Sequence, residues 1–316
     1  MEYAQLGLTE ASVSRIGFGC AAIGGYDYGK VNDEESIAAI RKALDLDINL
    51  FDTADVYGFG HSEEILAKAL GPARHRVIIA TKFGVTWDDR GRTRRDISAK
   101  TVEEAINGSL RRLGLDCIPL YQVHWPDGRT PIAETMTALM RCRERGKIRW
   151  VGCCNFPPEL VREAQSYCRL ESLQMPFSLL QDQTVEMLAG DLATSKATVL
   201  CYNVLAQGFF GGKYGTDTRF VGTDLRRNSI LFESQKLESN LLVLEKVKAV
   251  AECHGKTPAQ VAIRWVLDAS PNLCALTGAK NAAQITENAG AAGWKLSGED
   301  LACLGRDIRR YAVARN

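Results

Sequence analysis

The sequence lacks any long run of apolar residues, and this absence excludes an ordinary membrane-spanning helix. No run approaches the ~18 apolar residues that would suggest a span. The first ten residues, MEYAQLGLTE, contain no basic stretch followed by an apolar one, so they do not resemble a secretory signal. We therefore expect a cytoplasmic protein that does not bind membranes.

An excess of charge of either sign is also missing. The 39 lysines and arginines nearly balance the 38 aspartates and glutamates, which gives a formal net charge of +1. Such a chain has no strong general attraction for nucleic acid or for an anionic surface. We expect a small-molecule ligand, while the composition leaves the oligomeric state open.

Paired cysteines and clustered histidines are absent too. Ten cysteines are present, but no two of them have the C-x-x-C spacing of redox or zinc sites. The four histidines, at positions 61, 75, 124 and 254, do not have the spacing of metal ligands. We expect reduced cysteines that pack as small apolar residues, and no metal site.

What the sequence does contain is a regular alternation of short apolar runs and amphipathic stretches. The apolar runs predict strands at 16–20, 49–54, 77–82, 118–124, 148–154, 172–177, 197–203 and 274–278. The amphipathic stretches predict helices at 33–45, 62–70, 101–113, 131–145, 157–168, 184–195, 236–253, 258–269 and 281–290. Because no linker divides these βα units, we predict an α/β protein, a single (β/α)8 TIM barrel domain over residues 1–316.

Two longer segments, 83–98 and 206–235, interrupt the alternation and are predicted as irregular loops. Long excursions after barrel strands usually build the binding face. The first segment either contacts a polar or anionic substrate or forms a solvated loop in which opposite charges balance. Its arginines are at positions 90, 92, 94 and 95, and its aspartates are at 88, 89 and 96.

Polar residues lie at the ends of three consecutive predicted strands: Asp52, Lys82 and His124. Neighbouring strands are about 4.8 Å apart, so three in a row span only about 10 Å. Tyr57 follows Asp52 by five residues and can join the three from the loop above. We expect the four side chains to converge at one mouth of the barrel.

Such a set suits proton transfer to a carbonyl oxygen. A tyrosine, whose ordinary pKa is about 10, is a poor proton donor at neutral pH unless a nearby ammonium stabilises its phenolate. Asp52 would hold Lys82 and offset its buried charge, and His124 could donate to the substrate oxygen or pass a proton. Each residue alone also has an ordinary structural explanation, so it is their convergence that indicates a site.

The motifs around these residues resemble those of the aldo-keto reductase superfamily, from about residue 3 to about residue 305. FDTADVYGFGHSEEILAKAL (51–70) resembles the family's D-T-A-x-x-Y-G-x-x-x-S-E segment. IIATKFG (78–84) is similar to its strand-end lysine, and LYQVHWPD (120–127) to its strand-end histidine followed by tryptophan. The resemblance implies a catalytic tetrad of Asp52, Tyr57, Lys82 and His124, with Tyr57 as general acid in reduction and base in oxidation.

Three further motifs imply a nicotinamide cofactor. GCCNF (152–156) with LQMPF (173–177), CYNVLAQGFFGGKY (201–214) and GAKNAAQITENAG (278–290) resemble the family's G-x-S-N-F, Y-S-P-L-A-Q-G-L-L-x-G-K-Y and G-A-R-x-x-x-Q-x-x-E-N. The implied cofactor contacts are Cys154, Asn155, Gln174, Tyr202, Asn203, Leu205, Gln207, Gly208, Lys213, Gly278, Ala279, Lys280, Gln284, Glu287 and Asn288. The chain departs from the family at Cys154, which replaces a serine, at Asn203 and Val204, which replace Ser-Pro, and at Lys280, where arginine is frequent.

The last motif also predicts which nicotinamide cofactor is bound. Lys280, Gln284 and Asn288 are spaced by four at the start of a predicted helix, where backbone N–H groups and the helix dipole favour an anion. A 2′-phosphate fits this position, so NADPH/NADP+ is expected rather than NADH. Taken alone, the same spacing is also that of a solvated helix face.

We therefore expect an NADP(H)-dependent oxidoreductase that interconverts an aldehyde or ketone and its alcohol by direct hydride transfer. Two alternatives stay open: an NAD-dependent sugar or secondary-alcohol dehydrogenase on the same scaffold, and an NADPH-binding regulatory subunit with little turnover. Aromatic residues on loops after strands are candidates for the substrate walls. They are Tyr26, Tyr28, Trp87 and Trp125, with Phe210 as a further candidate.

Overall fold

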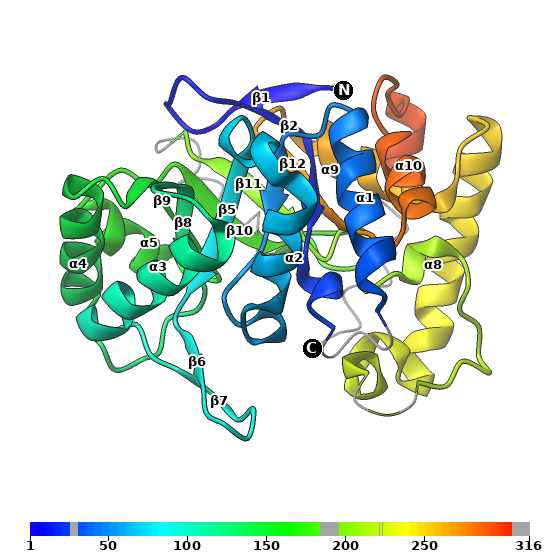
Figure 1. Cartoon of the computed structure of the whole chain (residues 1–316). Coiled ribbons are helices and arrows are strands. Elements are labelled where there is room, and N and C mark those ends of the chain that lie inside the picture. Colours follow the sequence, from blue (N-terminus) through cyan, green and yellow to red (C-terminus); the bar gives the residue numbers. More distant parts are fainter. Residues whose placement is uncertain (26–30, 184–195, 221, 223, 305–316) are drawn as a thin grey trace.

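The computed structural model describes residues 1–25, 31–183, 196–220, 222 and 224–304 (Figure 1). Tyr26, Tyr28 and the predicted helix at 184–195 lie outside the described residues.

Eight parallel strands form a closed barrel, and each lies within two residues of its predicted position. They are β3 (Ile16–Gly19), β4 (Leu50–Asp52), β5 (Ile78–Phe83), β8 (Ile118–Val123), β9 (Ile148–Cys154), β10 (Ser172–Pro176), β11 (Thr198–Tyr202) and β12 (Leu273–Gly278). Their order around the barrel is their order in the chain, and β12 pairs with β3 to close it. The prediction of a (β/α)8 barrel is confirmed.

Helices surround the strands, with α3 and α4 on one side and α8 on the other (Figure 1). The described α-helices are α1 (Asp33–Asp45), α2 (His61–Leu70), α3 (Ala99–Leu113), α4 (Ile132–Glu144), α5 (Pro158–Gln165), α8 (Ser234–Cys253), α9 (Pro258–Ala269) and α10 (Ala282–Ala289). Local sequence fixes several starts. The Asn32 side chain accepts from two backbone N–H groups of α1, and Thr257 forms a capping box with Gln260 ahead of α9.

Two antiparallel hairpins differ from the sequence prediction. β1 (Tyr3–Gln5) pairs with β2 (Ser12–Ser14) across one end of the barrel (Figure 1). β6 (Val85–Trp87) pairs with β7 (Thr93–Arg95), so the prediction that 83–98 is irregular was wrong. Strands of three residues are too short to show a periodic pattern, and the side chains of β7 are all exposed. The described part of 206–235 contains only short 3-10 turns before α8 begins.

Inside the barrel, the side chains change from apolar to polar along the strands. The apolar part consists of Leu50, Ala80, Leu120, Trp150, Leu200, Cys274 and Leu276, together with Leu6 and Val13 from the β1–β2 segment. Side chains two residues apart on a strand share a face. Asp52 and Lys82 follow Leu50 and Ala80 by two residues, so they also point inward, one level nearer the carboxyl ends.

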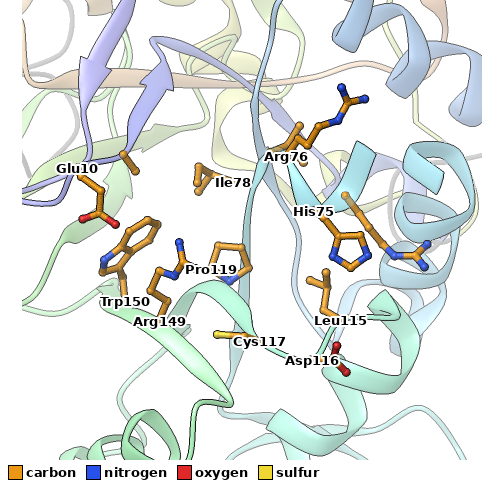
Figure 2. A pocket seen from close by; sticks show the side chains of 13 residues that line it. Glu10, His75, Arg76, Ile78, Leu115, Asp116, Cys117, Pro119, Arg149 and Trp150 are labelled. Atoms are coloured by element: carbon orange, nitrogen blue, oxygen red, sulfur yellow. The ribbon is translucent and has the colours of Figure 1, made fainter. Parts of the chain in front are cut away.

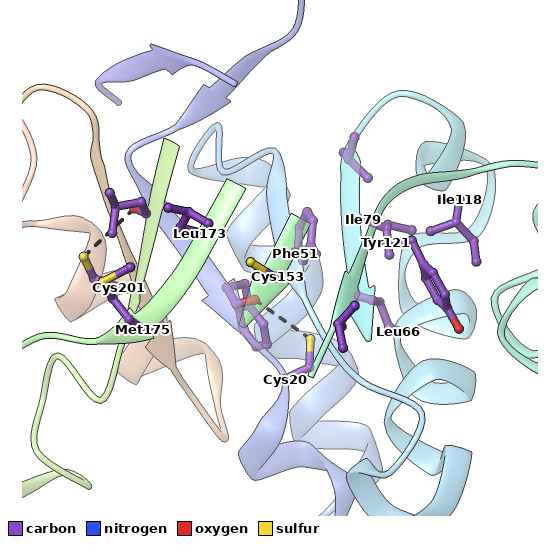
Figure 3. Packing of buried hydrophobic residues seen from close by; sticks show 14 of the residues in the cluster. Cys20, Phe51, Leu66, Ile79, Ile118, Tyr121, Cys153, Leu173, Met175 and Cys201 are labelled. Atoms are coloured by element: carbon purple, nitrogen blue, oxygen red, sulfur yellow. Dashed lines mark hydrogen bonds between the residues drawn. The ribbon is translucent and has the colours of Figure 1, made fainter. Parts of the chain in front are cut away.

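A larger apolar cluster fills the space between the strands and the helices, and Figure 3 shows Phe51, Ile79 and Leu66 within it. The cysteines contribute to this packing: six of the ten are buried, including Cys20 and Cys153. The thiols of buried cysteines therefore act mainly as small apolar groups, as predicted. No helix among the described residues has both the length and the apolar character to span a membrane.

Candidate active site

The candidate site is centred on Lys82, which is fully buried at the carboxyl end of β5. Its Nζ donates to Asp52 Oδ1, Asp52 Oδ2 and the Thr53 carbonyl, each at 2.8 Å. The three N–H groups of the ammonium thus have three acceptors, which is what a buried charge requires. Burial raises the pKa of Asp52, and the Lys82 charge opposes that rise.

Tyr57 lies beside this ion pair, in the 3-10 turn that follows β4 (Tyr57–Gly60). The centroid of its ring is 5.2 Å from Lys82 Nζ and 5.7 Å from the centroid of the His124 ring, which is nearly perpendicular to it. The structure therefore brings Asp52, Tyr57, Lys82 and His124 together at one mouth of the barrel.

Gly58 allows the Tyr57 turn to approach a neighbouring turn closely. Its φ is 61°, and a Cβ at this position would collide with the carbonyl oxygen of Gly24. Only glycine satisfies both conditions without strain. The turn that holds Tyr57 is thus packed, backbone against backbone, on the 3-10 turn Ala21–Gly24.

His124 is held in its neutral form. Its side chain is buried, and burial, the Lys82 charge and the Arg95 charge together hold the pKa of the imidazole well below its ordinary value. Its Nδ1 is buried without a hydrogen-bond partner, while its backbone N–H donates to the Phe83 carbonyl at 2.8 Å. A neutral imidazole can donate a hydrogen bond without adding a charge to the site.

A chain of hydrogen bonds between buried side chains leads to Asp52. Gln174 Nε2 donates to Asp52 Oδ2 at 3.2 Å, and Gln122 Nε2 donates to Gln174 Oε1 at 2.7 Å. Ser172 Oγ donates in turn to Gln122 Oε1 at 2.9 Å. A Cβ on Gly152 would collide with the Ser172 hydroxyl, so a glycine is needed there. Gln122 and Ser172 were not predicted as site residues, although Gln122 faces the inside of the barrel two residues before His124.

Asn155 joins the ends of β8, β9 and β11. Its Nδ2 donates to the His124 carbonyl and to Cys154 Sγ, both at 3.0 Å, and its Oδ1 accepts from the Tyr202 hydroxyl at 2.7 Å. Its φ is 60°, a left-handed conformation that asparagine tolerates better than most residues. Cys154 is buried, and burial raises the pKa of its thiol, so the sulfur is neutral.

Left-handed residues also gather in the turn after β11, where three φ values are positive: 58° at Asn203, 48° at Ala206 and 57° at Gln207. Asn203 Oδ1 accepts from the Gln207 backbone N–H at 2.9 Å, and this bond closes the turn. A proline after residue 203 would disfavour this turn, because proline restricts the preceding residue to extended conformations. Leu205 and Gly208 belong to the same turn, whereas Lys213 is exposed farther along the chain.

The motif before α10 forms a compact junction with β12. The Lys280 backbone N–H donates to Gln284 Oε1 at 2.7 Å, and Asn288 Nδ2 donates to the Gly278 carbonyl at 3.3 Å. Gln284 and Asn288 therefore brace the junction between strand and helix. Ala279 is buried within the junction, and Glu287 is exposed.

Two residues that the sequence did not predict, Asp224 and Arg226, face Lys280 from the 206–235 segment. Arg226 binds both carboxylate oxygens of Asp224, at 2.8 and 2.5 Å, and donates to the Tyr214 hydroxyl at 2.6 Å. Burial lowers the pKa of Lys280, the Arg226 charge lowers it further, and Asp224 opposes both effects. No sequence pattern connects residues 224–226 to residue 280, because the fold of the intervening loop brings them together.

Aromatic side chains surround the mouth near Tyr57 and His124. The Trp87 ring lies 5.7 Å from the Phe59 ring, and the Trp125 ring lies 6.4 Å from the His124 ring. Trp87 and Trp125 thus lie next to the candidate site. Phe210 does not, because it is fully buried in a separate apolar cluster against Phe209.

The cavity in Figure 2 lies at the opposite end of the barrel. It has a volume of about 440 Å³, and its lining includes Ile78, Pro119 and Trp150, near the amino ends of β5, β8 and β9. The catalytic candidates lie at the carboxyl ends of the same sheet, so this cavity is not part of their site. Among the residues that the structure describes, no three metal-ligating side chains are clustered.

Comparison with known proteins gives a family match over most of the chain. Residues 15–305 match the model of the Aldo/keto reductase family. The chain is 37% identical over 303 residues to aldo-keto reductase YhdN of Bacillus subtilis, with 95% of this chain and 91% of that protein covered. It is 32% identical over 292 residues to aldo-keto reductase yakc [NADP(+)] of Schizosaccharomyces pombe, with coverages of 90% and 86%. It is 31% identical over 319 residues to an NADH-specific methylglyoxal reductase of Escherichia coli, with coverages of 96% and 97%.

A solved structure resembles the whole barrel. The glycerol dehydrogenase AKR11B4 from Gluconobacter oxydans superposes with a TM-score of 0.90 at 34% sequence identity. The match covers 98% of this chain and 95% of that one.

Proposed function

The chain belongs to the aldo/keto reductase family, and on that premise we propose that it is an NADP(H)-dependent oxidoreductase that interconverts an aldehyde or ketone and the corresponding alcohol. The observation that carries the proposal is the cluster of Tyr57, Lys82 and His124 around one point at the mouth of the barrel. Asp52 completes the cluster through its ion pair with Lys82.

Tyr57 is the proton donor in reduction and the acceptor in oxidation. The ammonium of Lys82 lies 5.2 Å from the centre of its ring, close enough to stabilise negative charge on the phenol oxygen. Because Asp52 balances the ammonium, the buried pair can stay charged through the reaction. General acid catalysis of this kind contributes about 10²–10⁴-fold to a rate.

His124 orients the carbonyl oxygen. Its ring is perpendicular to the Tyr57 ring at 5.7 Å, so both can approach the same substrate atom. Because burial and two nearby cations hold the pKa of His124 down, the imidazole donates as a neutral group. Two donors aimed at one oxygen polarise the carbonyl and stabilise the developing alkoxide.

The residues at the ends of β9, β10 and β11 fit a nicotinamide carboxamide. Gln174 uses one N–H for Asp52 and one lone pair for Gln122, which leaves it one donor and one acceptor. Asn155 Oδ1 accepts from Tyr202 and retains a second lone pair. Gln174 would donate to the carboxamide oxygen, and Asn155 would accept from its nitrogen. The bound nicotinamide supplies or accepts the hydride.

The preference for NADP(H) rests on the charges around Lys280. Lys280 and Arg226 are both cationic, and the Arg226 charge lowers the pKa of Lys280 while Asp224 acts in the opposite direction. A phosphate dianion at this position would stabilise both cations. We expect Lys280→Met to weaken NADPH binding at least about tenfold, the cost of one charged hydrogen bond, and to leave NADH binding nearly unchanged. Cofactor fluorescence titration measures both dissociation constants. Equal losses for the two cofactors would remove Lys280 from phosphate recognition.

The function itself is tested by Tyr57→Phe. Turnover of a panel of aldehydes, ketones and sugars, measured as the change in NADPH absorbance, should identify a substrate for the wild type. Tyr57→Phe should then lose reduction by at least about a hundredfold and keep its affinity for NADPH. Tyr167→Phe is the matched control, because Tyr167 is 45% exposed and has no place in the site. Retained turnover by Tyr57→Phe would exclude the proposed acid.

A second candidate is alcohol oxidation with NAD+. It is favoured by the likeness to the glycerol dehydrogenase from Gluconobacter oxydans and by the NADH-specific relative in Escherichia coli. Asp224 also supports it, because its bidentate pair with Arg226 already neutralises one of the two cations. Tighter binding of NADH than of NADPH, with turnover of polyols, would favour this candidate.

A further inference from the structure

The β6–β7 hairpin presents two different faces. Val85 pairs with Arg95, Thr86 with Arg94, and Trp87 with Thr93. Directly opposed residues in an antiparallel pair share a face, and so do residues two apart on one strand. Trp87 and Arg95 are therefore on one face, whereas Thr86 and Arg94 are on the other.

The face with Trp87 and Arg95 is directed to the mouth of the barrel. Trp87 contacts Phe59, two residues after Tyr57, with 5.7 Å between ring centroids. The guanidinium of Arg95 lies 4.5 Å from the centre of the Trp125 ring, next to His124. Arg95 is also among the causes that lower the pKa of His124, so its charge acts at the site itself.

Arg95 differs from its neighbours in its ion pairs. Arg92 binds Asp88 at 2.7 Å, and Arg94 is 3.3 Å from Asp96. Within the described part of the chain, no ion pair joins Arg95 to a carboxylate. Its side chain is exposed, so the guanidinium can receive a ligand from solution.

The acid on the loop after Trp125 is already committed to other groups. Asp127 accepts from the backbone N–H groups of Ile97, Arg129 and Thr130, and from the Thr130 hydroxyl at 2.7 Å. These bonds hold the pKa of Asp127 down to about 2 against the opposing effect of burial, and they fix its orientation. The charge of Arg95 thus stays unbalanced at a mouth where Asp52 already balances Lys82.

We propose that Arg95 is a specificity residue that binds an oxyanion, a carboxylate or a phosphate, carried by the carbonyl substrate. The inference rests on the proposed function, because it names the class of substrate reduced at the same site. A guanidinium presents paired N–H donors that match both oxyanions, and its position over the Trp125 ring holds it near the mouth. The substrates are anionic aldehydes or ketones, with the charged group extending toward the hairpin and the carbonyl beside Tyr57 and His124.

The test compares a charged with a neutral aldehyde in each of two related pairs. 4-Carboxybenzaldehyde is paired with methyl 4-formylbenzoate, and D-glyceraldehyde 3-phosphate with D-glyceraldehyde, so that the two pairs separate carboxylate from phosphate. We expect the wild type to prefer the charged member of at least one pair by kcat/KM. Arg95→Gln should lower kcat/KM for that member about tenfold to a hundredfold, mainly through KM. It should change the neutral member less than about twofold, because burial and Lys82 still hold the pKa of His124 down.

Two variants serve as controls. Arg95→Lys keeps the charge without the fork and should recover part of the preference. Arg94→Gln removes an equal charge from the opposite face of the hairpin and should leave the preference unchanged. The inference would be overturned if Arg95→Gln lost kcat/KM equally for charged and neutral substrates, or lost none. Reduction of the neutral aldehydes would still support the proposed function. Failure of the wild type to reduce any of the four compounds would overturn both.

Discussion

The ion pair between Lys82 and Asp52 is the residue-scale feature on which the candidate site depends. Lys82 is fully buried, and its ammonium donates to Asp52 and to the Thr53 carbonyl. Removing one partner of a buried pair leaves an uncompensated charge, which typically costs about 3–5 kcal/mol. Removing both partners leaves no charge to desolvate.

We therefore predict that Lys82→Met lowers the free energy of unfolding by about 3–5 kcal/mol and that adding Asp52→Leu restores most of it. Neither variant should reduce carbonyls, because both lack the cation beside Tyr57. Urea denaturation measures the stabilities. A double variant no more stable than Lys82→Met alone would show that the buried charge is not the cause.

Asp55 is a second buried acid, and it makes stability depend on pH. Its Oδ1 has no hydrogen-bond partner, and the nearby Glu63 carboxylate is bound by Arg112 at 2.6 Å. Burial raises the pKa of Asp55 well above its ordinary value, Glu63 raises it further, and Arg112 opposes both. The folded protein thus holds a proton on Asp55 at pH values where the unfolded chain has released it.

The sign of this effect follows from proton linkage. Above the unfolded value of about 3.9, the folded state binds more protons, so this group destabilises the protein as pH rises through its raised pKa. The stability of Asp55→Asn relative to the wild type should therefore increase as the pH rises above about 4, by at most ~1.4 kcal/mol per pH unit. Urea denaturation across this range measures the difference, with exposed Asp89→Asn as control. A difference that does not change with pH would contradict the account.

At the scale of elements, the turn after β4 fixes the position of Tyr57. Gly58 and Gly128 both have positive φ, 61° and 70°, but only at Gly58 would a Cβ meet another backbone. Alanine at either position costs about 1 kcal/mol for the left-handed conformation. Only Gly58→Ala must also displace the turn.

Gly58→Ala should therefore lower kcat for carbonyl reduction by at least about tenfold, because small misplacements of a catalytic group are costly. Gly128→Ala should change kcat by less than about twofold and lose only the ~1 kcal/mol of stability that the left-handed conformation costs. Steady-state kinetics and thermal melting on both variants provide the comparison. Equal activities would show that the contact between Gly58 and Gly24 does not position Tyr57.

Helices and strands with a strong hydrophobic pattern could be predicted from the sequence. β5 and β9 are apolar runs between amphipathic helices, and both were predicted within one residue at each end. β6 and β7 could not, because three-residue strands carry too little pattern and their partners are set by the turn between them. α5 ends at Gln165, three residues before its predicted end.

At the scale of the whole molecule, the barrel explains why part of the candidate site could be predicted. Inward residues repeat every second position and parallel strands end at one mouth, so Asp52, Lys82 and His124 were expected to converge. The four arginines of 83–98 were predicted as a group, either to contact a polar or anionic substrate or to form a solvated loop, so Arg95 could not be singled out. Arg226 and Asp224 were not predicted. The positions of these residues, at the mouth and beside Lys280, depend on tertiary contacts that no local pattern records.

The most direct test of the central claim follows deuterium from NADPH labelled at both C4 positions to the carbon of an aldehyde. The account predicts an alcohol with one deuterium on the former carbonyl carbon from the wild type. Tyr57→Phe, saturated with the same cofactor, should form at least about a hundredfold less of it. Unlabelled alcohol from the wild type, or labelled alcohol formed by Tyr57→Phe at the wild-type rate, would contradict the claim.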